Sequence, residues 1–249
     1  MMRLTVLGYW GGYPEAGEAT SAYLLTSGKR HYLIDCGSGS IAQLFKYIRL
    51  KDLRTCFLSH FHFDHSADLG VLQYAYLMNS YHDKDAAHLT IYAPATPEAN
   101  RKLYESVRGS TMRTIQSDDV IVVDDLTIRF LRTHHPVETL AMRFEGQGGE
   151  SFVYTSDTSY FPELVSFARG ANVLLAESSF YADALDDTAQ AAGHLRSYEA
   201  ARLAEAAGVQ RLYLTHLPHQ GLHQALLTEA KEHFGGLVTL VHSGLEIVV

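Results

Sequence analysis

Short apolar segments recur along the whole chain, and the spacing between them constrains the fold more than any other feature. Segments such as RLTVLG, RHYLIDC, SFVYTSD and RLYLTHL have the β-branched and aromatic composition of strands. Some are separated by hairpin-length turns, and others by helical patterns at about 39–48, 66–80, 97–108, 161–169, 197–207 and 222–234. Hairpins pair strands antiparallel, whereas helical connections pair them parallel. The spacing therefore predicts an α/β protein in which two mixed β-sheets pack together with helices outside.

The sequence reads as one domain over residues 1–249, because no linker, charge block or tandem repeat interrupts it. Hydrophobic residues make up 47% and charged residues 19%, which is ordinary for a globular protein with a core. The formal net charge is −8. This acidic balance argues against a broad, non-specific nucleic-acid surface.

No stretch approaches the ~20 consecutive apolar residues that a membrane-spanning helix needs. The first residues, MMRLTVLGYW, lack the apolar core of a signal peptide. We therefore expect a cytoplasmic protein that does not associate with membranes. Its two cysteines, Cys36 and Cys56, lie in the apolar runs YLIDC and RTCFL, a setting typical of buried free thiols.

The stretch LSHFHFDHSADLG crowds four polar side chains, His60, His62, Asp64 and His65, into six consecutive positions. It follows the strand-like run RTCFL and precedes a helical pattern, so these residues lie in a loop at a strand end. Imidazole and carboxylate groups are the usual ligands of zinc and its neighbours among the transition metals. Four ligands so close in sequence would strain around one ion, because an extended chain advances only ~3.3–3.6 Å per residue. Two adjacent ions would share them without that strain.

Further metal-ligand candidates follow three downstream strand-like runs. His134 and His135 follow LTIRFLR, Asp157 follows SFVYTS, and His216 follows RLYLT. Taken singly, a strand-exit Asp is more often a turn residue or a helix cap, and a lone His is more often solvated. Their recurrence in one setting favours a shared metal site.

These segments together resemble the metallo-β-lactamase superfamily over nearly the whole chain. The resemblance begins at TVLGYWGGYPEAGEATSAYLLTSGKRHYLIDCGSG and continues through SHFHFDH, THHPVET and YTSDTSY. Two later segments, LLAESSF and GHLRSYEAARLAEAAGVQRLYLTH, are similar to the phosphodiesterase branch that includes ribonuclease Z. The resemblance implies an αββα four-layer sandwich, in which two mixed β-sheets are flanked by helices and carry a metal pair at the sheet edges.

The resemblance also implies a ligand set and a cofactor. The cofactor would be two divalent transition-metal ions, with zinc expected and manganese as the alternative. His60, His62 and His135 would hold the first ion, and Asp64, His65 and His216 the second, with Asp157 bridging both. His135 is preferred to His134 because it directly precedes the Pro-Val pair of the family pattern, so His134 is expected outside the ligand set.

Two metal ions ~3.5–4 Å apart can share a water molecule, lower its pKa toward ~7 and clamp the oxygens of a phosphodiester during displacement. Asp64 would orient the bridging hydroxide while it binds the second ion. Ribonuclease Z enzymes place a general-acid histidine where this chain has His194, followed by Ser197, although the neighbouring residues differ. Glu177, at the end of a strand, would hydrogen-bond His194 and fix its tautomer. The simpler alternatives are a plain loop histidine and a surface carboxylate.

The expected function is therefore a metal-dependent hydrolase, a phosphodiesterase acting on a small phosphodiester such as a cyclic nucleotide. Alternatives are tRNA 3′-end processing of the ribonuclease Z type, a lactonase or thioesterase on the same scaffold, and a non-catalytic metal-binding protein. The interval between His135 and Asp157 is filled by strands and a turn, which leaves no room for a tRNA-binding arm. Structured nucleic acid is thus not an expected partner. A homodimer is expected by analogy with related diesterases.

Overall fold

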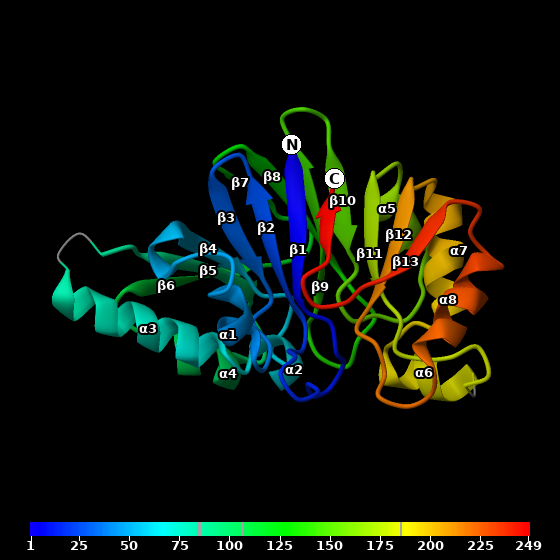
Figure 1. The fold of residues 1–249 in the computed structure, drawn as a ribbon, viewed down its shortest axis with the longest axis horizontal. Helices are drawn as coiled ribbons and strands as arrows, with labels where there is room; N and C mark the ends of the chain where they lie inside the picture. The colour runs from blue at the N-terminus through cyan, green and yellow to red at the C-terminus, as the bar shows by residue number, and fades with distance from the viewer. Residues whose placement is uncertain (84–85, 106, 185) are drawn as a thin grey trace. The chain divides into compact units, whose positions relative to one another are not determined.

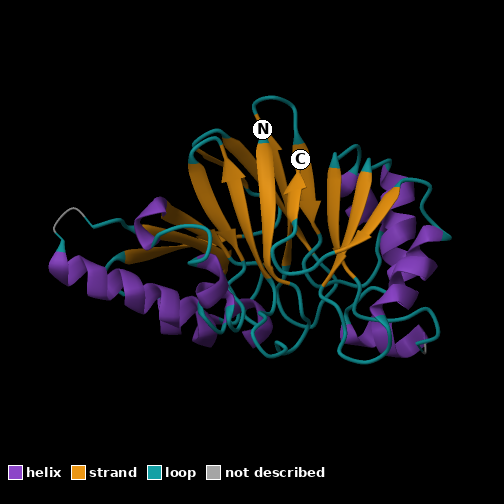
Figure 2. Ribbon diagram, viewed as in Figure 1, coloured by secondary structure: helices purple, strands orange, loops and turns teal. Residues whose placement is uncertain are grey.

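The structure, a computed structural model, describes residues 1–83, 86–105, 107–184 and 186–249. It contains two seven-stranded β-sheets accompanied by helices (Figures 1 and 2). The chain contacts divide into two compact units. The first comprises Met2–Ile115 and His242–Val248, and the second comprises Gln116–Val241 together with Met1 and Val249. Two mixed sheets flanked by helices were expected from the strand spacing, and this prediction is confirmed.

The sheet of the first unit has the strand order β14-β1-β2-β3-β4-β5-β6. Strands β14, β1, β2 and β3 pair antiparallel, whereas β3, β4, β5 and β6 pair parallel. The strands are β1 (Met2–Gly8), β2 (Ala22–Ser27), β3 (Arg30–Ile34), β4 (Leu53–Phe57), β5 (Leu89–Pro94), β6 (Ser110–Ile115) and β14 (Glu246–Val248). The helices are α1 (Ser40–Leu44), the 3₁₀ helix η1 (Leu50–Asp52), α2 (Phe63–Ser66), α3 (Leu69–His82) and α4 (Glu98–Tyr104).

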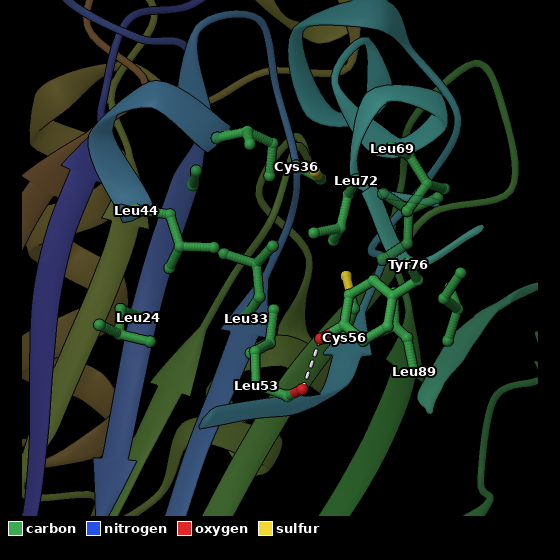
Figure 3. Close-up of a cluster of buried hydrophobic side chains, with 14 of the residues drawn as sticks. Leu24, Leu33, Cys36, Leu44, Leu53, Cys56, Leu69, Leu72, Tyr76 and Leu89 are labelled. Atoms are coloured by element: carbon green, nitrogen blue, oxygen red, sulfur yellow. Dashed lines mark hydrogen bonds between the residues drawn. The ribbon is translucent and has the colours of Figure 1, made fainter. Parts of the chain in front are cut away.

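The core of the first unit lies where α1 and α3 cover the sheet (Figure 3). Leu33 and Cys56 from the strands meet Leu72 and Tyr76 from α3, and all four are buried. The Tyr76 hydroxyl donates a hydrogen bond to the carbonyl oxygen of Leu53, which ties α3 to the start of β4. Apolar burial of this kind is the main force that holds a helix against a sheet.

Both cysteines are buried free thiols, as their apolar sequence context predicted. Burial is the main reason why the pKa of both thiols is raised. The nearby charge of Asp35 raises both pKa values further, and Cys36 also raises that of Cys56. Both sulfur atoms are therefore held in the neutral form and act as small apolar groups.

The sheet of the second unit has the order β13-β12-β11-β10-β9-β8-β7. Strands β7 to β10 pair antiparallel, and β10 to β13 pair parallel. The strands are β7 (Val120–Val123), β8 (Leu126–Arg132), β9 (Leu140–Gly146), β10 (Ser151–Tyr154), β11 (Val173–Glu177), β12 (Arg211–Thr215) and β13 (Leu237–Leu240). The helices are α5 (Pro162–Ala168), α6 (Asp186–Ala192), α7 (Ser197–Ala207) and α8 (His223–Lys231). Helix α7 packs between α5 and α8 and contacts β11 and β12 (Figure 1).

The strand directions position the polar side chains of each unit. Parallel strands end at the same edge of a sheet, so the residues that follow them lie close together. In the first unit, Asp35 and Ser59 follow the neighbouring strands β3 and β4 closely. In the second unit, Asp157, Glu177 and His216 lie at the ends of β10, β11 and β12. Within the described residues, every helix is too short or too polar to cross a membrane.

Candidate metal centre

The first unit brings the four side chains of the SHFHFDH motif into one cluster. His60 and His65 are fully buried, and their ring centroids lie 4.2 Å apart. His62 precedes the short helix α2, and its ring centroid lies 4.8 Å from that of His60. Asp64 Oδ2 lies 3.8 Å from His65 Nε2. The loop therefore presents three imidazoles and a carboxylate together.

A buried carboxylate that the sequence analysis missed, Asp35, orients two of these imidazoles. Asp35 accepts hydrogen bonds from the Ser59 amide at 2.7 Å, from Ser59 Oγ at 2.9 Å and from His65 Nδ1 at 2.7 Å. Because Ser59 Oγ gives its proton to Asp35, it accepts one from His60 Nδ1 at 3.0 Å. Both rings thus carry their proton on Nδ1, which leaves the Nε2 lone pair available for a cation.

Two glycines of neighbouring loops lie close to Asp64. The Gly12 amide donates a hydrogen bond to Asp64 Oδ2 at 2.8 Å. A Cβ atom at Gly37 would lie 2.1 Å from the Asp64 carbonyl oxygen and 2.2 Å from Thr20 Oγ1, so only glycine fits. Near Gly12, Tyr9 and Trp10 stack with a centroid distance of 5.0 Å. Burial, followed by the charges of Glu18 and Glu15, raises the pKa of Tyr9.

In the second unit, one carboxylate faces two histidines through its two different oxygen atoms. Asp157 Oδ2 lies 3.9 Å from His135 Nε2, and Asp157 Oδ1 lies 3.5 Å from His216 Nε2. His135 Nδ1 donates to the Gly193 carbonyl at 3.0 Å, which leaves its Nε2 as the nitrogen toward Asp157. This arrangement suits a carboxylate that bridges two cations, each with one histidine.

Three strand-exit residues at these positions have left-handed backbone conformations. The φ angles are 56° at Asp35, 53° at Ser156 and 52° at His216. Non-glycine residues adopt such angles uncommonly, and they cluster at functional sites, where surrounding contacts must hold them. Here they turn the chain sharply as it leaves β3, β10 and β12, at the residues that carry or precede the polar side chains.

The buried carboxylate of Glu177 connects His194 to His216. Glu177 Oε1 accepts the Thr158 amide and His194 Nδ1, both at 2.8 Å. Glu177 Oε2 accepts Ser179 Oγ at 2.6 Å, and Ser179 Oγ in turn accepts His216 Nδ1 at 2.8 Å. The ligand atoms of Glu177, His194 and His216 all lie within 4.8 Å of one another. The His194 ring, whose side chain is 18% exposed, lies 5.1 Å from the His135 ring and 5.4 Å from the His216 ring.

The structure thus groups the predicted site residues within each unit. In the first unit it places His60, His62, Asp64 and His65 together, and in the second His135, Asp157, Glu177, His194 and His216. His134 points elsewhere, because its ring is exposed and stacks on Phe161 at 4.2 Å. It had been expected outside the ligand set.

Asp35, Ser59 and Ser179 are the residues that sequence reasoning missed. Asp35 had a detectable signal, since YLIDCGSG has the same format of an apolar strand followed by a polar residue. Ser59 directly precedes His60, and Ser179 lies two residues beyond Glu177. A hydroxyl group can accept a hydrogen bond from an imidazole and donate one to a carboxylate, but proximity in sequence alone did not single out Ser59 or Ser179.

A family model described as "Beta-lactamase superfamily domain" matches residues 30–217 of the chain. The chain therefore belongs to the beta-lactamase superfamily. The probable metallo-hydrolase YhfI of Bacillus subtilis (strain 168) is 43% identical over 244 residues, which cover 98% of each protein. The crystal structure of the metallo-β-lactamase fold protein YhfI aligns with a TM-score of 0.92 at 40% identity, covering 99% of this chain and 98% of that one. The chain is accordingly a metallo-hydrolase with the metallo-β-lactamase fold.

More distant proteins extend the comparison. Ribonuclease Z of Haloarcula marismortui is 25% identical over 304 aligned positions, which cover 98% of this chain and 96% of the relative. A diphosphatase from the PhnP family aligns with a TM-score of 0.79 at 19% identity, covering 100% of this chain and 98% of that one. At 19% identity, the similarity to the diphosphatase shows only that the two proteins share a fold.

Proposed function

We propose that this metallo-hydrolase is a di-metal phosphodiesterase that cleaves a small phosphodiester such as a cyclic nucleotide. The observation that carries the proposal is the geometry of Asp157, whose two oxygen atoms face the Nε2 atoms of two different histidines. A carboxylate that served a single ion would not need both oxygens aimed at separate imidazoles. The proposed first ion is held by His60, His62 and His135, the second by Asp64, His65 and His216, with Asp157 shared.

The tautomers of the imidazoles support this assignment. His60, His65, His135 and His216 each direct Nδ1 at an oxygen atom of the protein, at 2.7 to 3.0 Å. In each ring the oxygen atom holds the proton on Nδ1 and leaves a lone pair on Nε2. Four histidines prepared in the same way, beside two carboxylates, form a donor set suited to zinc or manganese. Bound divalent ions would supply Lewis acidity toward water and toward the phosphate oxygens.

The protein's own residues account for proton transfer and orientation. Asp64, held in place by the Gly12 amide, orients the attacking water. His194 donates a hydrogen bond from Nδ1 to Glu177. Its Nε2 can therefore carry a second proton and donate it to the departing oxygen. The Glu177 carboxylate stabilises the protonated ring during this transfer, in the way that carboxylates orient catalytic imidazoles in general.

Three features favour a small diester over tRNA as the substrate. The interval between His135 and Asp157 is occupied by β9, a turn and β10, which form part of the sheet. The alignment with ribonuclease Z extends over 304 positions, more than the 249 residues of this chain, so the relative contains segments without a counterpart here. The net charge of −8 also disfavours the many phosphate contacts that tRNA binding requires.

Ribonuclease Z activity is the second candidate, because the similarity to that enzyme covers 98% of this chain. A direct competition between substrate classes tests both candidates. Metal-reconstituted protein is assayed with cyclic nucleotides, bis-p-nitrophenyl phosphate, unprocessed tRNA, a lactone and a thioester at near-physiological salt. Hydrolysis of the diesters without tRNA cleavage supports the proposal. Efficient, site-specific tRNA cleavage, or a clear preference for the lactone or thioester, would overturn it.

The number of metal ions is tested separately. Elemental analysis after metal titration should give two ions per chain for the native protein. Asp157→Asn should lower the affinity for both ions, because the amide offers only one acceptor oxygen. Asp119→Asn, which changes a carboxylate near the start of β7, is the matched control and should leave binding unchanged. A saturated native protein that holds at most one ion contradicts the di-metal assignment.

A further inference from the structure

Two aromatic side chains of the first unit are exposed where the SHFHFDH motif meets the loop that follows β1. Phe63 lies between His62 and Asp64 in the sequence and is 74% exposed. Tyr13 is 58% exposed. The Gly12 amide, directly before Tyr13, donates a hydrogen bond to Asp64 Oδ2 at 2.8 Å, so the loop passes beside α2 (Figure 1). Each aromatic residue is thus the direct sequence neighbour of one partner in this bond, and both adjoin a proposed metal ligand.

The buried contacts of the motif are made by Phe61 rather than by Phe63. Phe61 packs parallel to Tyr104, with ring centroids 6.3 Å apart. Helix α2 is anchored through Ser66 Oγ, which donates hydrogen bonds to the carbonyl oxygens of Phe61 at 3.2 Å and His62 at 2.9 Å. Single exposed apolar residues are common on proteins, but an apolar surface that continues into a proposed active site indicates ligand binding.

Hydrogen bonds hold the backbone of the loop that carries Tyr13. The Tyr13 amide donates to the Gly11 carbonyl at 2.9 Å and closes a three-residue turn around Gly12, whose φ angle is 74°. Further along the loop, Gln43 Nε2 donates to the Gly17 carbonyl at 2.6 Å and ties the loop to α1. A side chain on a backbone that is already ordered loses less conformational freedom when it contacts a ligand.

The charges of this loop favour an uncharged group beside the diester. Residues 9–21 include Glu15 and Glu18 but no Lys or Arg, and Asp64 adds a third carboxylate next to the loop. Carboxylates repel a second phosphate or a polyanionic backbone. The faces of aromatic side chains instead favour flat rings, on which they can stack. A neutral nucleobase combines both properties that this part of the surface selects.

We propose that Tyr13 and Phe63 bind the base of a nucleotide substrate and make this protein selective for diesters that carry a nucleobase. The inference rests on the proposed phosphodiesterase function and deepens it, because it names the group that is recognised beside the cleaved bond. Stacking tolerates different bases, since every base has a flat π-face. Cyclic nucleotides with different bases should therefore be distinguished from one another less than from an analogue without a base.

A pair of matched substrates tests the proposal on metal-reconstituted protein. One is 3′,5′-cyclic AMP, and the other is the 3,5-cyclic phosphate of 1-deoxyribose, which has the same diester ring without the base. The native protein should prefer cyclic AMP, and Phe63→Ala and Tyr13→Ala should each lower the ratio of the two kcat/KM values roughly 5–150-fold. Phe63→Tyr keeps a ring and should retain the preference. Phe45→Ala and Tyr74→Ala remove aromatic side chains of the same unit, exposed by 46% and 61%, and should leave the ratio unchanged.

Two kinetic results would overturn the proposal. One is a native protein that hydrolyses both diesters equally well. The other is an equal loss on both diesters in Phe63→Ala and Tyr13→Ala, which would show that the rings support the metal ligands and do not contact the base.

Calorimetric binding of AMP and of ribose 5-phosphate measures the same contact without turnover. The native protein should bind AMP more tightly, and both alanine variants should lose that preference. A protein that hydrolyses neither diester but shows this binding pattern would refute the phosphodiesterase function and support the base site. Equal affinity of the native protein for AMP and ribose 5-phosphate would refute the base site, whatever the activity.

Discussion

Replacing Asp35 by asparagine tests whether a carboxylate outside the ligand set prepares the histidines for metal binding. The Asp35 side chain is fully buried and receives three hydrogen bonds, two from Ser59 and one from His65 Nδ1. Asparagine has the same shape but only one acceptor oxygen, and its amide group is a donor. Every orientation of the new side chain therefore sets a donor against a donor.

The two orientations have different consequences. If the amide group takes the place of Oδ2, it faces His65 Nδ1 and Ser59 Oγ. His65 must then move its proton to Nε2, and Ser59 Oγ, once it accepts from the amide, must donate to His60 Nδ1. Both imidazoles would thereby lose the Nε2 lone pair. If the amide group takes the place of Oδ1, it opposes the buried Ser59 amide, which loses its acceptor.

The size of the effect follows from these mismatches. A buried donor without an acceptor costs about 1–3 kcal/mol. Substitutions of residues that orient metal ligands typically lower affinity or activity 10–100-fold. A tenfold change corresponds to about 1.4 kcal/mol, so the two estimates agree. We expect Asp35→Asn to weaken metal binding 10–100-fold, at both ions, since it affects one proposed ligand of each.

Competition with a chromogenic chelator measures the affinity of each ion directly. Asp52→Asn, on the surface 3₁₀ helix η1, introduces the same chemical change away from the cluster and should bind metal like the native protein. Saturating metal should restore most of the activity of Asp35→Asn, because His194 and Glu177 lie in the other unit. Native affinity for both ions in folded Asp35→Asn protein would refute the argument that Asp35 sets the histidine tautomers.

Three further outcomes follow from the structure. His194→Ala should slow hydrolysis of diesters with alkoxide leaving groups ~10²–10⁴-fold, as expected for a general acid. It should slow p-nitrophenyl esters far less, and equal losses in initial-rate assays would indicate a binding role. Gly37→Ala should cost ~1–3 kcal/mol of stability through overpacking and weaken metal binding, because the new Cβ would meet the carbonyl of Asp64; Gly235→Ala, with its nearest contact at 3.9 Å, is the control for calorimetry. Burial raises the pKa of Cys36 and Cys56, so a thiol reagent at pH 8 should modify neither until the protein unfolds.

The parts of this site that depend on local sequence could be predicted from it. His216 directly follows the apolar strand β12, and His60 lies three residues after the end of β4. The ends of neighbouring parallel strands lie at the same sheet edge, whatever the rest of the chain does. The division into strands and helices has the same local origin, because the apolar period and the turn residues are short-range features. The apolar period and the turn residues were therefore enough to predict the two mixed sheets.

Residues that act on other residues were harder to recognise. Asp35 lies 24 positions from Ser59 and 30 positions from His65 along the chain, and its role exists only through those contacts. A strand-exit aspartate is most often a turn residue, so its sequence context alone could not separate the two roles. Ser178 and Ser179 present the same difficulty, because both hydroxyls follow Glu177 and only the fold determines which one contacts His216.

The hydrogen bonds of Glu177 link two histidines of the second unit, His194 and His216. Glu177 accepts His194 with one oxygen and Ser179 with the other, and Ser179 accepts His216. The proposed proton donor and a proposed metal ligand are therefore oriented by one buried carboxylate. Removal of that carboxylate would take the acceptor from His194 Nδ1 and from Ser179 Oγ, and would therefore disturb the orientation of both imidazoles. The fully buried carboxylate of Glu177 thus couples the orientation of the proposed proton donor to that of the proposed ligand.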